Sequence, residues 1–224
     1  MICFVDDLGL TAYQAAWDLQ NRLAAEVAHG DRPATLLLLE HPHTYTFGRR
    51  GQAQNLLWDQ KTLEERGVSV YWVDRGGDIT YHGPGQLVGY PIMRLPDQDH
   101  VGYVRKLEKL LISALFALGL TAYQVSGKTG VWIRCEGHDR NKLAKIASIG
   151  VKVDANGVTR HGFALNVDPK MEYFEGIIAC GLVGDPLTSL AHFFPIVPGM
   201  DLVKREVLHA FAESFGFEIV QTGI

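Results

Sequence analysis

The chain has 224 residues, a length that suits one domain with a well-buried core, and we expect residues 1–224 to form a single domain. Its 21 Lys and Arg residues against 25 Asp and Glu residues give a net charge of −4, which excludes the polybasic character typical of nucleic-acid-binding proteins. Purely apolar runs such as residues 36–39 are too short to cross a bilayer, and three cysteines without a C-x-x-C pair indicate neither a disulfide framework nor a zinc knuckle. We therefore expect a protein of the reducing cytoplasm that binds neither membrane nor nucleic acid.

The spacing of apolar residues predicts the secondary structure. Helices are expected over residues 10–28, 103–118 and 202–215, and Cys3 is expected on a first strand. Further strands are expected over residues 34–39, 68–73, 86–92, 131–133, 146–153 and 158–167. Asn156-Gly157 predicts a hairpin between the last two strands, because both residues tolerate positive φ. Hairpins mixed with helices, without regular alternation, indicate an α+β fold with a mixed, mostly antiparallel sheet flanked by helices.

One glycine-rich segment is the clearest candidate for a binding site. Residues 75–85, RGGDITYHGPG, come just after the apolar run 68–73 and combine four glycines and a proline with an Arg, a Tyr and a His. Glycine lets a backbone turn sharply and approach a ligand closely. The segment therefore predicts a ligand-binding loop, and the alternative is a hairpin connection whose polar residues face water.

The same segment resembles a known protein family. Residues 75–92, RGGDITYHGPGQLVGYPI, are similar to the signature of LipB-type octanoyltransferases. The resemblance continues, in the family's order, through HPHTYTFG (41–48), GVWI (130–133), KIASIG (145–150), HGFALNV (161–167) and Cys180-Gly181. It implies the fold shared with biotin and lipoate protein ligases, and transfer of an octanoyl group without cofactor, ATP or metal. The implied donor is octanoyl-acyl carrier protein, and the implied acceptors are lysines of lipoyl domains of 2-oxoacid dehydrogenase complexes and of the glycine cleavage H protein.

Cys180 and Lys145 are the candidate reacting groups. Cys180 ends a short apolar run before Gly181, where a tight turn can leave amide groups free to hold a developing oxyanion; the alternative is a small buried hydrophobe. Strand alternation puts Lys145 on the apolar face with Ala147 and Ile149, where it would titrate as a pair with a thiolate; the alternative is that the strand starts later and Lys145 lies in solvent.

The resemblance assigns roles to these residues and to a pocket. It implies that Cys180 carries the acyl group as a thioester and that Lys145 activates the thiol, although Ala179 stands where many relatives have proline. The implied substrate-binding residues are Arg75, Gly76, Gly77, Asp78, Ile79, Thr80, Tyr81 and His82 in the loop, and Ser148, Ile149, Gly150, Gly162, Phe163 and Ala164 on the strands. Small residues at 150, 162 and 164 predict a groove for an apolar chain, with close packing at the glycines as the alternative.

Several further features admit specific interpretations. Residues 122–129 satisfy a relaxed phosphate-loop pattern, but a strand rather than a helix is predicted to follow, which argues against nucleotide binding. His41 and His43 lack further ligands at plausible spacing, so we expect no metal. Arg75 is predicted to order its loop or to meet a phosphate, and Arg49-Arg50 to dock an acidic carrier protein.

Two other functions remain compatible with the sequence. One is an ATP-dependent lipoate or biotin protein ligase, although the arginine-glycine-rich motif of biotin ligases is absent. The other is a non-catalytic module that binds acyl chains or lipoyl domains. An assay with free octanoate and ATP separates the first from an octanoyltransferase, and a covalent acyl-enzyme separates the second.

Overall fold

The structure is a computed structural model that describes all residues except 96, 98, 135–142, 179–184 and 223–224. The helices are α1 (Tyr13–His29), α2 (Gln60–Glu65), α3 (His100–Ala117) and α4 (Met200–Phe215), with short 3-10 helices η1 (Ala53–Asn55), η2 (Met171–Gly176) and η4 (Leu190–His192). The strands are β1 (Ile2–Leu10), β2 (Ala34–Glu40), β3 (Thr44–Phe47), β4 (Ser69–Trp72), β5 (Ile79–His82), β6 (Gln86–Ile92), β7 (Ala122–Val125), β8 (Lys128–Arg134), β9 (Leu143–Val153), β10 (Thr159–Asn166) and β11 (Glu218–Gln221).

The strands form two sheets. The larger has the order β11-β1-β2-β6-β10-β9-β8-β7, and only the pairs β1 with β11 and β1 with β2 are parallel. The smaller has the order β4-β3-β5. The prediction of an α+β fold with a mixed, mostly antiparallel sheet flanked by helices is confirmed.

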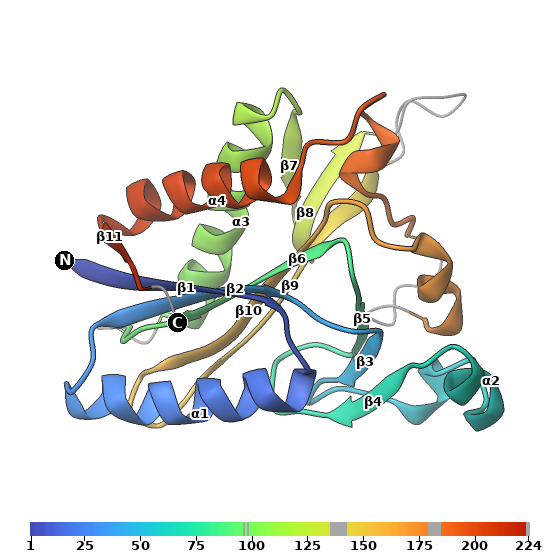
Figure 1. Ribbon diagram of the computed structural model, residues 1–224, viewed down its shortest axis with the longest axis horizontal. Helices are drawn as coiled ribbons and strands as arrows, with labels where there is room; N and C mark the ends of the chain where they lie inside the picture. The colour runs from blue at the N-terminus through green and yellow to red at the C-terminus, as the bar shows by residue number, and fades with distance from the viewer. Residues whose placement is uncertain (96, 98, 135–142, 179–184, 223–224) are drawn as a thin grey trace.

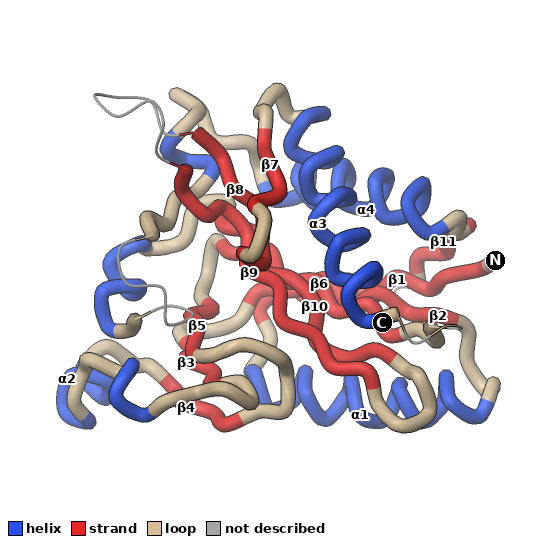
Figure 2. Tube along the Cα trace, turned by 180° about the vertical axis from the view of Figure 1, so that it is seen from behind, coloured by secondary structure: helices blue, strands red, loops and turns tan. Residues whose placement is uncertain are grey.

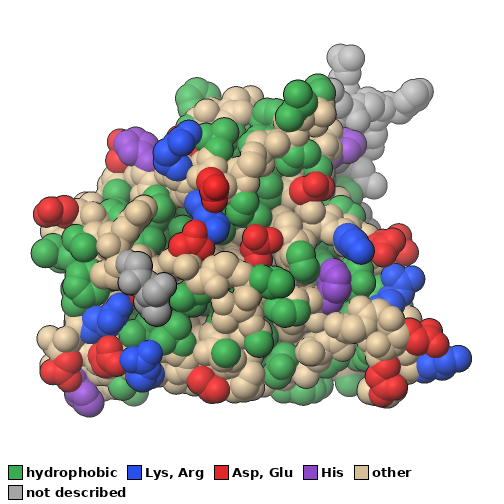
Figure 3. All heavy atoms as spheres, viewed as in Figure 1, with side chains coloured by type: hydrophobic (Ala, Val, Ile, Leu, Met, Phe, Trp, Pro, Cys, Tyr) green, Lys and Arg blue, Asp and Glu red, His purple; other side chains and the backbone are tan. Residues whose placement is uncertain are grey.

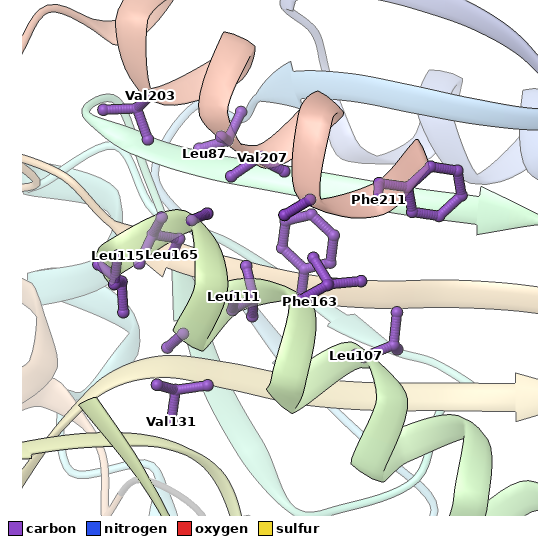
Figure 4. Packing of buried hydrophobic residues seen from close by; sticks show 14 of the residues in the cluster. Leu87, Leu107, Leu111, Leu115, Val131, Phe163, Leu165, Val203, Val207 and Phe211 are labelled. Carbon is purple, nitrogen blue, oxygen red and sulfur yellow. The ribbon is translucent and has the colours of Figure 1, made fainter. Parts of the chain in front are cut away.

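Helices cover both faces of the larger sheet. In Figure 1, α1 runs along one face, whereas α3 and α4 cross the other, and the view from behind in Figure 2 shows the same layers. The main core lies between α3, α4 and the sheet, where Leu107, Leu111 and Phe211 pack on Phe163 (Figure 4). A second core lies between α1 and the sheet, where Leu23 of α1 packs with Leu37 and other apolar residues of β2 and β6.

The longer predicted elements are confirmed and several short ones were missed. The hairpin at Asn156-Gly157 joins β9 to β10, with Gly157 at φ 73° and the Asp154 carboxylate accepting hydrogen bonds from the amides of Asn156 and Val158. The first helix begins at Tyr13 rather than at residue 10, because residues up to Leu10 belong to β1. The elements α2, β3, β5, β7 and β11 were not predicted.

Neither the charge distribution on the visible surface nor the composition of the helices departs from what the sequence predicts. On the face shown in Figure 3, basic and acidic side chains are interspersed rather than gathered into a patch of one sign. No helix in the described part of the chain combines the length and the apolarity that crossing a membrane requires.

Candidate functional site

The glycine-rich segment contains a strand, β5, as well as a loop. Its alternation sends successive side chains to opposite sides. Thr80 and His82 line a narrow slot, whereas Ile79 and Tyr81 pack into an aromatic cluster with Tyr45 and other residues of the small sheet and η2. The structure therefore brings only half of β5 to the slot, and the hydroxyl of Tyr81 hydrogen-bonds to Nδ1 of His43 at 2.8 Å.

The narrow slot lies where the two sheets meet. Eleven residues expected to bind substrate line it: Arg75, Gly76, Gly77, Thr80, His82, Ser148, Ile149, Gly150, Gly162, Phe163 and Ala164. Its volume is about 40 Å³, which corresponds to roughly three water-sized volumes at about 10–15 Å³ each. The slot by itself is therefore too small to enclose an eight-carbon chain.

Glycine packing shapes the slot more tightly than the sequence suggested. A Cβ atom at position 162 would overlap the carbonyl oxygen of Gly89, and one at position 150 would lie 3.0 Å from the carbonyl oxygen of Gly76. Both positions therefore admit neighbouring backbone at close range. The alternative of close packing at glycines describes these two residues, although both also border the slot.

Arg75 holds the loop from inside. Its side chain is 6% exposed, and its guanidinium donates to the carbonyl oxygen and hydroxyl of Thr46 and to the carbonyl oxygen of Gly76. The amide of Gly76 donates to the carbonyl oxygen of Val151 on β9 at 2.9 Å. Of the two predicted roles for Arg75, ordering of the loop is confirmed.

Asp78 links this loop to the chain before Cys180. Its carboxylate accepts hydrogen bonds from the side chain of Asn55 at 2.5 Å and from the amides of Ile79 and Gln52. The carbonyl oxygen of Asn55 in turn accepts from the amide of Ile178 at 2.8 Å. Asp78 lies outside the narrow slot and lines a neighbouring hollow instead.

The inner end of the slot carries buried polar aromatic side chains that sequence reasoning missed. Tyr13, Tyr90 and His161 line it together with His82. Burial lowers the pKa of His82 well below its ordinary value and the pKa of the adjacent His41 to about 4. Both ring nitrogens of His41 are bonded, to the Thr11 carbonyl oxygen and the Tyr90 hydroxyl, so His41 is the satisfied histidine that was predicted.

His161 is held by a cluster around Asp74. Its Nε2 donates to Asp74 at 2.7 Å, and the same carboxylate receives Lys152 at 2.6 Å and Arg160 at 2.8 Å. The hydrogen bond from His161 is the largest cause of a strongly lowered Asp74 pKa. Burial lowers the pKa of His161. The backbone of His161 has φ 56°, a left-handed conformation rarely adopted by residues other than glycine. The signal in the sequence that could have identified His161 as a site residue is its position at the start of the motif HGFALNV.

Lys145 lies on β9, two residues inside the start of the strand, and its side chain is 4% exposed. The alternative that it lies in solvent is wrong. The prediction that it shares a face with Ala147 is also wrong. On β8, Val131 pairs with Ala147 and the next residue, Trp132, pairs with Lys145. Ile146 therefore has no partner on β8 and forms a β-bulge, which shifts the register by one residue. Ile146 and Ala147 both pack in the main core, and Lys145 joins Ser148 on the opposite face.

The Lys145 side chain opens onto a second space, the lysine hollow, of about 570 Å³. Gly76, Gly77, Ser148, Ile149 and Gly150 line both this hollow and the narrow slot, so the two adjoin. The Lys145 ammonium lies 4.8 Å from the centroid of the Trp132 ring. A group bound in the slot therefore has an exit beside an amine.

Cys180 and Ala179 lie outside the described residues. Residues 186–188, which follow these positions in the sequence, are hydrogen-bonded to the backbone of Lys145. The Lys145 amide donates to the Pro186 carbonyl oxygen at 2.8 Å, and the Thr188 amide donates to the Lys145 carbonyl oxygen at 3.0 Å. Lys128, another residue lining the lysine hollow, forms a 2.7 Å ion pair with Asp185. A relay of side chains from Gln86 through Asn166 joins His82 to Thr188.

Two other features singled out in the sequence can be located in the structure. Residues 122–129 belong to the antiparallel hairpin of β7 and β8, so the prediction that a strand rather than a helix follows the phosphate-loop-like pattern is confirmed. Arg49 and Arg50 have exposed side chains, but their amides donate to the carbonyl oxygens of Arg75 and Gly77. These bonds fix the arginine pair to the rim of the lysine hollow, which Arg50 lines.

Comparison with known sequences matches the chain to one family. The model of the lipoyl protein ligase A/B catalytic domain matches residues 12–212. The chain is 46% identical over 213 residues to the octanoyltransferase of Chloroflexus aurantiacus, a match that covers 94% of this chain and 93% of that protein. It is 43% identical over 209 residues to the octanoyltransferase of Rubrobacter xylanophilus, covering 93% and 91% of the two chains.

Comparison with solved structures shows the fold. A lipoate-protein ligase A bound with ATP superposes with a TM-score of 0.77 at 15% identity, covering 100% of this chain and 90% of that one. The bi-partite lipoate protein ligase of Thermoplasma acidophilum gives 0.76 at 17% identity, covering 100% and 88%. The biotin protein ligase of Aquifex aeolicus gives 0.51 at 13% identity, covering 96% and 70%. The architecture is therefore that of lipoate and biotin ligase catalytic domains.

Proposed function

Because the chain belongs to the family of lipoyl protein ligase A/B catalytic domains, we propose that it is an octanoyltransferase of lipoate biosynthesis. The proposed reaction moves an octanoyl group from octanoyl-acyl carrier protein to a lysine of a lipoyl domain, through a thioester on Cys180. Curated relatives that span nearly the whole chain support the acyl group and the reaction class. The observation that carries the proposal is the buried Lys145 beside a slot that adjoins its hollow.

The first half of the reaction transfers the acyl group to the enzyme. The Cys180 thiolate attacks the thioester carbon, a carbon–sulfur bond forms, and the bond to the carrier sulfur breaks. The Lys145 ammonium gives its proton to the departing carrier thiolate and becomes a neutral amine. Since a thiolate rather than a thiol is the nucleophile, a nearby cation that favours the anion is required.

The second half transfers the acyl group to the acceptor. The neutral amine of the lipoyl-domain lysine attacks the thioester carbon, an amide bond forms, and the Cys180 thiolate leaves. The proton of the attacking amine passes to Lys145, which restores the starting ammonium and thiolate. The cycle consumes no ATP and changes no oxidation state.

Two features support Cys180 as the nucleophile although it lies outside the described residues. The amide of Ile178, two residues before it, is bonded to Asn55 and through it to the loop that borders the slot. Asp185, five residues after it, is paired with Lys128 at the lysine hollow. Of the other cysteines, Cys3 is buried in the core, and burial raises its thiol pKa to about 12.

The acyl-enzyme is tested by intact mass. Incubation with octanoyl-acyl carrier protein is expected to add the mass of one octanoyl group to the wild-type chain, and a lipoyl domain is expected to remove it. Cys180→Ala should remain unmodified and lose turnover. Normal turnover in Cys180→Ala would disprove the mechanism. Efficient acylation with free octanoate and ATP would favour a ligase, and tight binding without an adduct would favour a binding module.

Arg49 and Arg50 are proposed to dock the donor carrier protein. Lys128, which lines the lysine hollow, is paired with Asp185. Arg105 and Lys152, which line a second hollow together with Arg49, are paired with Glu108 and Asp74. No carboxylate in the part of the chain described by the structure pairs with Arg49 or Arg50, so their charge is available to an anionic partner. Exposed pairs of this kind mainly govern the association rate and its salt dependence.

The docking proposal predicts a specific loss for Arg49→Glu/Arg50→Glu. The KM for octanoyl-acyl carrier protein should rise about tenfold or more at low salt, with a smaller effect at high salt because counterions screen the interaction. Arg22→Glu/Lys61→Glu makes the same change in net charge at two exposed positions that line neither the slot nor the lysine hollow, and serves as the control. An unchanged KM with unchanged salt dependence would contradict the proposal.

A further inference from the structure

The Lys145 ammonium has an aromatic neighbour rather than a carboxylate. Within the described residues, its Nζ atom makes no hydrogen bond or ion pair, and the group in favourable contact is the Trp132 ring, 4.8 Å from Nζ to the centroid. A cation within about 6 Å of an aromatic face is attracted by the negative face of the ring, and tryptophan gives the strongest such attraction. Trp132 therefore provides the stabilising contact that a buried ammonium needs.

Trp132 is directed to Lys145 by the sheet itself. The two residues are register partners on β8 and β9, so their side chains stand on the same face. Trp132 is 1% exposed and does not belong to the main core, which contains its neighbours Val131 and Ile133. The bulge at Ile146 creates this arrangement, because without it Lys145 would project into the core beneath α3.

A second ammonium contacts the same ring. Nζ of Lys128 lies 5.1 Å from the Trp132 centroid, and it donates to both carboxylate oxygens of Asp185 at 2.7 Å. Asp185 directly follows the segment that contains Cys180. The indole thus has one lysine balanced by a carboxylate and another, Lys145, that has no such partner in the described part of the chain.

We propose that Trp132 is a positioning residue of the transfer reaction: its ring holds the Lys145 ammonium at the hollow, and the Lys128–Asp185 pair fixes the chain after Cys180 to the same ring. The inference rests on the proposed Cys180 and Lys145 chemistry. It adds the residue that directs the buried lysine side chain toward the hollow.

The physical reason concerns the balance between burial and attraction. Removal from water disfavours an ammonium ion, and the ring face offsets part of that penalty. Other charged groups border the same space: Arg50, Asp78, Lys128 and Asp185 around the hollow, and Glu108, which accepts a hydrogen bond from the amide of Gly130 beside the Lys145 stem. These groups remain when Trp132 is replaced, so a change in thiolate formation at Cys180 would report on the ring.

The experiment measures thiolate formation rather than turnover alone. Trp132→Met removes the aromatic face but keeps an apolar side chain, and Trp132→Phe keeps a smaller aromatic ring. The rate of iodoacetamide alkylation would be followed against pH by peptide mass at residue 180, since the chain has three cysteines. At pH 7 we expect a loss of about threefold to thirtyfold in Trp132→Met and about twofold to threefold in Trp132→Phe. In both variants the rise in rate should move to higher pH.

A core variant controls for general loss of packing. Ile133→Ala alters the neighbouring residue of β8, whose side chain faces the main core, and should leave the pH profile unchanged. An unshifted profile in folded Trp132→Met, or an equal shift in Ile133→Ala, would overturn the proposal. Should Trp132→Met fail to fold, the Phe variant decides, because a profile identical to wild type would also overturn it.

Failure of this inference is separable from failure of the proposed function. Absence of an octanoyl adduct on the wild-type chain would remove the thioester mechanism, whereas alkylation at residue 180 would still report the thiolate. Conversely, a normal octanoyl adduct with no effect of either Trp132 variant on the alkylation profile would leave the transfer reaction intact and remove only the role of Trp132.

Discussion

The interaction between Arg75 and Thr46 shows how one buried charge fixes the loop that borders the slot. The guanidinium donates to the Thr46 carbonyl oxygen at 2.5 Å and to its hydroxyl at 3.0 and 3.2 Å. Burying a charge is costly unless its hydrogen bonds are satisfied. The sequence indicated that Arg75 orders the loop or meets a phosphate, but it could not identify Thr46, which lies 29 residues away on a strand that was not predicted.

Thr46→Val tests this interaction at constant shape. The change leaves two guanidinium donors without the hydroxyl, so we expect a loss of about 1–3 kcal/mol in the free energy of unfolding together with a lower kcat/KM. Thr44→Val is the matched control on the same strand, since its buried hydroxyl donates to the neutral Pro42 carbonyl oxygen and its loss should cost less. Urea unfolding and steady-state kinetics measure both effects. Equal destabilisation by the two variants would show that the charged partner has no special weight.

At the scale of elements, the sequence predicted what short-range chemistry determines. Asn156-Gly157 located the β9–β10 hairpin because a two-residue turn signal acts within a few residues. Strand β5 was hidden inside a glycine-rich run, since its four residues are stabilised by pairing with β3, a contact between distant segments. Element existence was therefore predicted best where the cause is local.

The face of Lys145 illustrates the opposite case. Simple alternation along β9 predicts the apolar face, and a single extra residue at Ile146 reverses every side chain before it. That bulge depends on how β8 pairs with β9, which no periodicity within β9 can reveal. The same limit applies to the slot: its glycine-rich walls were predicted from motifs, whereas Tyr13 and Tyr90 enter it from α1 and β6 through packing alone.

At the scale of the whole molecule, the slot occupies the junction of two sheets and α1, where several buried histidines lie together. His41 and His82 are ring neighbours, with centroids 5.6 Å apart, and Tyr13 stacks near both. Burial lowers the pKa of both histidines, so the folded protein holds His41 and His82 neutral near neutral pH. The Tyr13 and His82 rings that line the slot are thus uncharged near neutral pH, which suits an apolar ligand.

This arrangement predicts acid sensitivity of the fold below about pH 6.5. The unfolded chain binds protons on these histidines near their ordinary pKa of 6.5, whereas folded His41 does so only near 4, so stability is present above the first value and is lost as pH falls toward the second. The His41 contribution is on the order of 3 kcal/mol, and His82 and His161 act in the same direction. The stability that Asp74 contributes is lost only below about pH 4, because above its ordinary pKa of 3.8 the carboxylate is ionised in both the folded and the unfolded chain.

His41→Gln separates the histidine contribution from general acid denaturation. The glutamine amide can donate to the Thr11 carbonyl oxygen and accept from the Tyr90 hydroxyl, as His41 does, but it does not titrate. Urea unfolding measured from pH 7.5 down to 4.5 should show a shallower decline in the variant than in wild type, approaching a difference of one bound proton at the acidic end. His29→Gln, at an exposed position near the end of α1, should decline as steeply as wild type. Parallel curves for His41→Gln and wild type would mean that the buried histidine does not govern this loss, and the acid sensitivity would then have to come from carboxylates that titrate at the lower end of the range.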